Sequence, residues 1–312
     1  MRKSFSSSIM RNKASLLYYS FKSISNYLKY FVQERKDVLL VSGDIEPVHR
    51  MRVASRRLRA ALNVFNNILP RQKAKLWKKE ISRIGQVLGR ARELDMHIKF
   101  LQGVKKRLKK DSYIVNIELI IESLEIKRGQ AQKQVERALT GFEIEKNLPG
   151  LKACLRELSS EARRHLKNKF YNRDSALIQE RLDKLFEFVP YISNPQNIHE
   201  LHQMRIAAKN LRYILEILKP WYGEWVDKYI RACRDIQDVL GDVHELDVLI
   251  ELLSGFVKAQ DKEFNHTLEY LLRECVHLRN NAYKKFIRVW NSTQRRRMWV
   301  KLRWEILGFV FS

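Results

Sequence analysis

Residues 48–65 read VHRMRVASRRLRAALNVF, and residues 201–218 read LHQMRIAAKNLRYILEIL. The two stretches share His, Met, Arg, Ala, Leu, Arg and Leu at matching places, at an offset of 153 residues. A second pair follows in the same order: residues 84–101 read IGQVLGRARELDMHIKFL, and residues 236–253 read IQDVLGDVHELDVLIELL. A period of about 150 residues is far longer than that of a solenoid repeat, so the chain is predicted to contain a duplicated, domain-sized unit.

The composition favours an all-α protein. Only 11 Gly and 6 Pro occur in 312 residues, 45% of the residues are hydrophobic, and no run alternates with the period of a strand. Helices are expected near 15–40, 46–69, 71–109, 112–140, 148–190, 197–219, 221–258 and 261–291, with a short one near 294–308. A break near Asn172 is the alternative for the helix over 148–190. We therefore predict two pseudo-twofold-related four-helix bundles, in residues 1–145 and 146–292, and a basic and aromatic tail in residues 293–312.

The charge of the chain points to an anionic partner. Lys and Arg number 60 against 35 Asp and Glu, which gives a net charge of +25. The three cysteines are odd in number and far apart in the sequence, so a disulfide framework and a CxxC metal knuckle are excluded. No secretory signal and no apolar run long enough to span a membrane is recognisable, so a soluble, cytoplasmic protein is expected.

Basic side chains of the first repeated stretch fall on one side of a helix, nearly opposite its apolar side chains. The first basic stripe consists of His49, Arg52, Arg56 and Arg59. The second basic stripe consists of His202, Arg205, Lys209 and Arg212. The spacing i, i+3, i+7, i+10 holds four such groups on one side over about 15 Å of helix. This arrangement suits an extended anion.

A single basic stripe is more often a solvated helix face than a binding site. Solvated faces, however, usually carry Asp or Glu one turn away from each basic residue, because like charges weaken a helix. Neither basic stripe contains an acidic residue, and both begin with His. Solubility alone does not require the same uncompensated cluster twice, so anion binding is the favoured interpretation.

The repeated motifs resemble the CHAD domains, helical domains named for their histidines, over roughly residues 15–291. That family pairs an H-x-x-R-x-x-x-[RK]-x-x-R helix with an L-G-x-x-x-[DE]-L-D helix, and both motifs occur twice. The second motif is matched by Leu88, Gly89, Glu93, Leu94 and Asp95, and again by Leu240, Gly241, Glu245, Leu246 and Asp247. The resemblance implies two four-helix bundles around a basic central channel that binds inorganic polyphosphate, with no catalytic activity and no cofactor.

Further basic residues are candidates for the walls of such a channel. Arg57 belongs to the first repeat, where the second repeat has Asn210. Weaker similarity between residues 118–138 and 270–290 adds four candidates, which are Lys127, Lys133, Arg279 and Lys285. For Asp95 and Asp247 we favour a structural role, either in an ion pair or in helix packing, because no partner for acid catalysis is visible.

Two alternatives remain at this point. Weak, sequence-nonspecific nucleic-acid binding would also use a basic groove, although the basic stripes lack the aromatic residues on which single-strand binders stack bases. A phosphohydrolase would need acidic metal ligands or a nucleophile and base, and neither is recognisable.

A metal site at the histidines is disfavoured by the surrounding positive charge. The tail is expected to pack as an additional helix, with docking on acidic lipid as the alternative.

Overall fold

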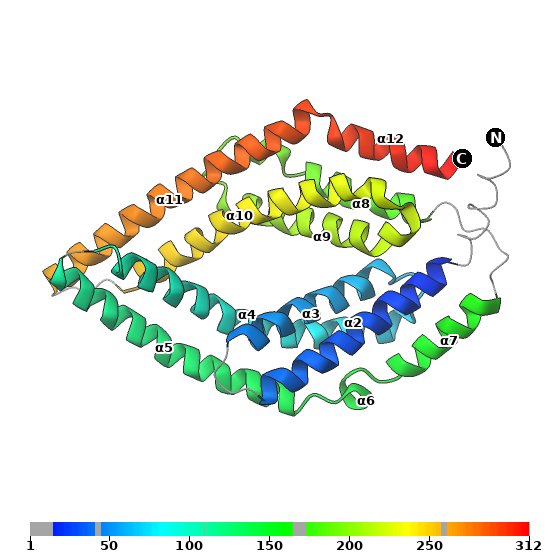
Figure 1. The fold of residues 1–312 in the computed structure, drawn as a ribbon, viewed down its shortest axis with the longest axis horizontal. Helices are drawn as coiled ribbons and strands as arrows, with labels where there is room; N and C mark the ends of the chain where they lie inside the picture. The colour runs from blue at the N-terminus through cyan, green and yellow to red at the C-terminus, as the bar shows by residue number, and fades with distance from the viewer. Residues whose placement is uncertain (1–14, 41–44, 109, 165–172, 257–260, 312) are drawn as a thin grey trace. The chain divides into compact units, whose positions relative to one another are not determined.

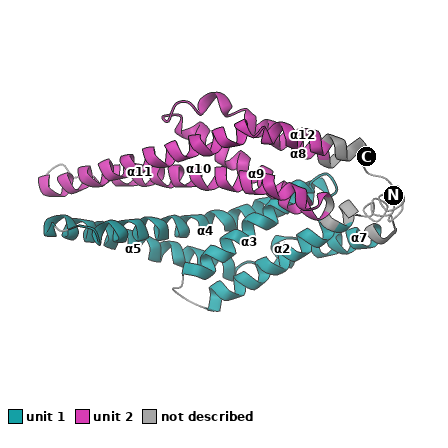
Figure 2. Cartoon of the chain, turned by 45° about the horizontal axis from the view of Figure 1, so that its top comes forward, with its two compact units in different colours: residues 1–170 teal, residues 171–312 magenta. Residues whose placement is uncertain are grey.

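A computed structural model describes residues 15–40, 45–108, 110–164, 173–256 and 261–311, and every regular element in these ranges is a helix (Figure 1). The chain divides into two compact units, residues 1–170 and residues 171–312 (Figure 2). This division falls later than the predicted 145/146 boundary. The all-α prediction is confirmed.

Unit 1 is a bundle of four long helices. They are α2 (Ser15–Leu40), α3 (Ile45–Val64), α4 (Arg71–Lys105) and α5 (Asp111–Thr140). Each packs against the next in the chain, and α5 also contacts α2, so the bundle closes. The core contains fully buried Met51, Leu58, Trp77 and Ile84. These bounds agree with the predicted helices to within a few residues.

The helix expected over residues 148–190, with a break near Asn172 as the alternative, is present as α7 and, later in the chain, α8 (Arg173–Phe186); residues 165–172 between them lie outside the described ones. A short α6 (Ile144–Asn147) is followed by α7 (Leu151–Arg164), which packs on α2 through buried Leu151, Leu155 and Leu158. Between them Gly150 has a φ of +72°, which favours glycine. The indole nitrogen of Trp77 donates to the carbonyl of Pro149 at 3.0 Å, which holds this turn on α4. These contacts make α7 part of unit 1.

Unit 2 contains five longer helices in its described residues. They are α8 (Arg173–Phe186), α9 (Ile198–Tyr222), α10 (Asp227–Ser254), α11 (Lys262–Arg295) and α12 (Met298–Phe311), with 3₁₀ turns at Val189–Tyr191 and Glu224–Val226. Successive helices pack together, and α12 contacts both α11 and α8. In α12 the side chains of Trp299, Leu302 and Ile306 are buried. The prediction that the tail packs as an additional helix is confirmed.

Buried ion pairs join the third and fourth long helices of each unit. Asp95 on α4 accepts a hydrogen bond from Nε of Arg128 on α5 at 2.6 Å, and Asp247 on α10 accepts one from Nε of Arg279 on α11 at 2.9 Å. Arg279 also donates to the carbonyl of Pro195 at 2.6 Å. The structural role predicted for Asp95 and Asp247 is confirmed, as a helix-packing contact.

Candidate anion-binding site

Burial of the apolar side of α3 in the bundle fixes the direction in which its basic side chains point. Met51, Ala54 and Leu58 are fully buried in unit 1, so the side chains of the first basic stripe leave the helix on the other side. All four members of that stripe are partly buried. They therefore lie at the edge of the bundle and not on a fully solvated face.

Small residues on α4 accommodate the arginines of the first basic stripe. A Cβ atom placed on Gly89 would lie 2.5 Å from Nη1 of Arg52, so the guanidinium of Arg52 occupies the space above this glycine. About two turns toward the N-terminus of α4, Nη1 of Arg59 donates to Oγ of Ser82 at 2.9 Å. The glycine of the second motif therefore provides room for an arginine of the first.

The electrostatics of unit 1 favour an anion at this site. The pKa of His49 is lowered, first by burial and next by the positive charge of Arg92 on α4, with Arg56 and Arg52 adding to the effect and Glu46 opposing it. Nδ1 of His49 and Nε of Arg56 are buried and accept or donate no hydrogen bond within the described residues. A phosphoryl group would supply acceptors for such donors and would favour the charged histidine.

Unit 2 repeats this arrangement with one change. A Cβ atom on Gly241 would lie 3.4 Å from Nε of Arg205, so an arginine again lies over the glycine of the second motif. The ring of His202 on α9 lies against that of His244 on α10, with 3.9 Å between ring centroids and 42° between ring planes. Burial, followed by the positive charges of Arg205 and Lys209, lowers the pKa of His202.

Arg92 and His244 are site residues that the sequence analysis missed. Each is the third residue after the glycine of the second motif, Gly89 in one case and Gly241 in the other. Both positions hold a basic residue: the charge of Arg92 acts on His49, and the ring of His244 lies against that of His202. A comparison of basic residues at matching places of the second motif would have found them.

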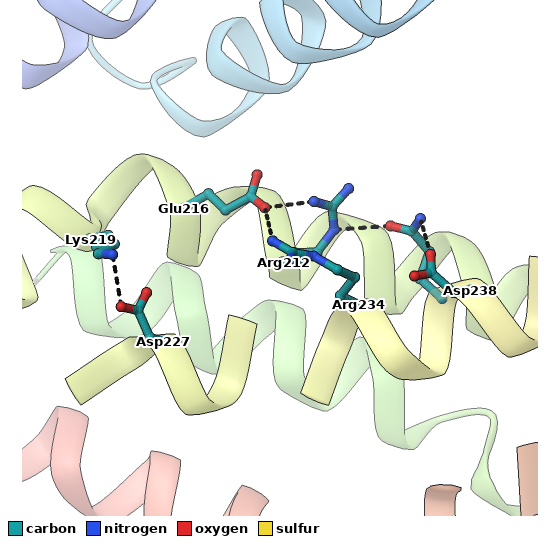
Figure 3. Close-up of polar contacts among 7 residues, drawn as sticks. Arg212, Glu216, Lys219, Asp227, Arg234 and Asp238 are labelled. Atoms are coloured by element: carbon teal, nitrogen blue, oxygen red, sulfur yellow. Dashed lines mark hydrogen bonds and ion pairs between the residues drawn. The ribbon is translucent and has the colours of Figure 1, made fainter. Parts of the chain in front are cut away.

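The end of the second basic stripe is compensated, contrary to the expectation of an acid-free stripe. Arg212 donates through Nη1 to Glu216 at 2.6 Å and through Nε to Gln237 at 3.0 Å, and Arg234 also lies 3.9 Å from Glu216 (Figure 3). Glu216 stands one helical turn beyond Arg212 and so outside the motif. In unit 1 the corresponding Arg59 contacts the neutral Ser82. The charge of Arg212 is therefore already paired within unit 2, and its main role is structural.

The remaining candidates are Arg57, Lys127, Lys133, Arg279 and Lys285, which are not members of the two basic stripes. Arg57 is exposed on the side of α3 that faces α2, where it and Arg50 oppose the rise in the pKa of Tyr30 that burial causes. Lys127 and Lys133 are exposed on α5, and Lys285 is exposed on α11. Arg279 is only 5% exposed and paired with Asp247, so its prediction as a channel residue does not agree with its place in the core of unit 2.

Comparison with known proteins gives the family. The family model of the CHAD domain matches residues 24–254. The chain belongs to the CHAD family. No curated protein matches the sequence of this CHAD protein.

Two solved structures share the fold. The crystal structure of the CHAD domain from the plant Ricinus communis is 21% identical, with a TM-score of 0.63 over 94% of this chain and 92% of that one. PptA from Streptomyces chartreusis is 12% identical, with a TM-score of 0.65 over 88% of this chain and 99% of that one. At these identities the likeness supports the fold of the CHAD protein and not the roles of single residues.

The chemistry offered by this CHAD protein is that of hydrogen-bond donors and positive charge. Arginine presents planar donor forks, lysine a mobile point charge, and histidine a donor whose charge an anion favours. Among the residues described, no group of three or more His, Cys, Asp or Glu side chains is placed to hold a metal ion. Within the same ranges no helix combines the length and apolar character needed to cross a membrane.

Proposed function

We propose that this CHAD protein binds inorganic polyphosphate without catalysis, through basic side chains on α3, α4, α9 and α10. In unit 1 the proposed ligands are His49, Arg52, Arg56, Arg59 and Arg92. In unit 2 they are His202, Arg205, Lys209 and His244. The observation that carries the proposal is that both units place a guanidinium over the glycine of the second motif, beside a partly buried histidine.

Polyphosphate fits this set of donors. It is a flexible chain with about one negative charge per phosphate and no base or sugar edges, so it is recognised through charge and oxygen acceptors alone. Clustered cations repel one another in the free protein, and an anion relieves that repulsion. CHAD domains in general are associated with polyphosphate, which agrees with this chemistry. We further propose that Lys127 and Lys133 extend the basic surface of unit 1 and that Lys285 extends that of unit 2.

Arg57, Arg212 and Arg279 have smaller roles in the proposal. Arg212 and Arg279 already donate to carboxylates, and a phosphoryl group would have to compete with Glu216 and Asp247 for them. Arg57 lies on the α2 side of α3, away from the side that carries the first basic stripe. Unit 1 is therefore proposed to supply more permanent positive charge to the ligand than unit 2.

Calorimetric titration of the purified chain with polyphosphate of defined length tests the proposed function. We expect saturable binding and a raised melting temperature, because a ligand that binds only the folded state stabilises it. Single- or double-stranded DNA is added as competitor at equal phosphate concentration. Displacement of polyphosphate by DNA would favour the nucleic-acid alternative, and release of orthophosphate in the presence of Mg²⁺ would contradict a purely binding role.

Gly89→Ala is expected to weaken polyphosphate binding several-fold without loss of stability. The new Cβ would lie 2.5 Å from Nη1 of Arg52, so the guanidinium must move, while alanine favours the helix by about 1 kcal/mol. Gly103→Ala on the same helix is the matched control, because nothing lies within 4 Å of its added Cβ. Affinity by titration and stability by urea unfolding check both effects. Equal affinities for the two variants would contradict the placement of Arg52 in the site.

A further inference from the structure

The two units differ in the side chain that accompanies the histidine of each basic stripe. In unit 1 the positive charge of Arg92 acts on His49, whereas in unit 2 the ring of His244 lies tilted against that of His202. Arg92 and His244 occupy the same place, three residues after the motif glycine. Unit 1 therefore carries a permanent charge where unit 2 carries a group that gains its charge only by taking up a proton.

We infer that His202 and His244 form a proton-dependent phosphate-binding pair, so that unit 2 takes up protons as it binds polyphosphate while Arg92 binds in unit 1 at any physiological pH. The inference rests on the proposed function. Its geometric basis is the contact of two imidazole rings at 3.9 Å, with Nδ1 of His202 buried and lacking a hydrogen-bond partner in the described part of the chain. A phosphoryl group beside the rings would accept hydrogen bonds from both protonated imidazoles.

The charges around this pair oppose protonation in the free protein. Arg205 and Lys209 on α9 act on both rings, and His199 acts in addition on His202. Burial, followed by the charges of His202, Arg205 and Lys209, lowers the pKa of His244 to about 4.

No acidic side chain of the described residues is among the groups that act on either ring. On α10 itself Asp247 is paired with Arg279 of α11, and partial desolvation raises the pKa of the exposed Asp242, an effect that Lys285 of α11 opposes. None of the charged side chains of α8 is among the groups that act on either ring in the described residues. The pair is thus uncharged near pH 7, and a polyanion is the partner that would reverse this by neutralising Arg205 and Lys209.

The sign of the pH dependence follows directly. A pKa that is low in the free state and raised in the complex means that binding takes up protons, so affinity rises as pH falls. Each proton taken up contributes up to about tenfold in affinity per pH unit. In unit 1, protonation of His49 adds to the proton uptake on binding, whereas Arg92 takes up no proton because it is already charged.

The test is calorimetric titration of the full chain with defined-length polyphosphate at pH 6.0, 6.75 and 7.5, in two buffers that differ in ionisation enthalpy. Wild type should show proton uptake and an affinity that rises with falling pH. His244→Arg copies the arrangement of unit 1, so it should reduce both the proton uptake and the rise of affinity with falling pH. At pH 7.5 this variant should bind polyphosphate more tightly than wild type. Arg92→His should have the opposite effect and steepen the pH dependence. His266→Arg, which adds the same charge at an exposed position on α11, is the control and should change neither slope nor proton uptake.

The outcomes separate this inference from the proposed function. Absence of polyphosphate binding by wild type would overturn the proposed function and the inference with it. Binding with the same proton uptake in wild type, His244→Arg and Arg92→His would overturn the inference alone and leave the proposed function standing. Because Arg92 is a partly exposed surface residue, Arg92→His keeps the test decisive even where His244→Arg fails to fold.

Discussion

Replacing both Arg52 and Arg205 by alanine is expected to weaken polyphosphate binding about 100-fold. Each arginine lies over the glycine of its second motif, next to the histidine that begins a basic stripe. A charge-assisted hydrogen bond contributes about 1.5–3 kcal/mol, so two lost arginines remove about 3 kcal/mol or more of binding free energy. At 1.4 kcal/mol per tenfold change in affinity, this corresponds to about 100-fold. Calorimetric titration with polyphosphate of defined length measures the effect.

A variant of equal charge separates local contacts from the overall field. Lys36→Ala/Arg288→Ala removes two positive charges from exposed positions on α2 and α11. This control should lower affinity only a few-fold, since exposed charges are screened by salt. Equal losses in the two double variants would show that net charge, and not the two basic stripes, attracts the ligand.

Raising the salt concentration from about 50 to about 200 mM is expected to weaken polyphosphate binding on the order of 10²-fold. Each phosphate neutralised by the protein releases condensed counterions, and a slope of about −0.7 per contact over roughly six contacts gives this loss. The nine proposed ligands are all basic, so most of the binding free energy should depend on salt. Affinity measured at four or five salt concentrations provides the slope.

The same salt series on Arg52→Ala/Arg205→Ala gives an internal check. Loss of two phosphate contacts should reduce the magnitude of the slope by about 1–2. A wild-type slope near zero would mean that binding is not dominated by counterion release, and an unchanged slope in the variant would place both arginines outside the phosphate path.

Much of the fold was predictable because it depends on local periodicity. The apolar stripe of α3, with Met51, Ala54 and Leu58 fully buried, agrees with the 3.6-residue pattern of the sequence. Scarcity of Gly and Pro indicated the helices, and Asp95 was correctly assigned a structural role. The place of α7 was not predictable, since it depends on which helix its apolar side contacts, and that helix is α2, which lies more than a hundred residues earlier in the sequence.

The site was only partly predictable for a related reason. The basic stripes follow from the spacing on one helix, but the partners of their side chains come from other helices. Arg92 acts on His49 from α4, His244 contacts His202 from α10, and Glu216 compensates Arg212 from beyond the end of the motif. Arg279 is basic in the sequence and buried in the structure, because Asp247 on α10 pairs with it.

The most direct measurement of the central claim is a crystal structure of the chain with a bound polyphosphate of defined length. We predict phosphoryl oxygens within hydrogen-bond distance of Arg52 and His49 in unit 1 and of Arg205, His202 and His244 in unit 2. Phosphate density confined to other basic surfaces, such as the exposed residues 295–297 that precede α12, would contradict it.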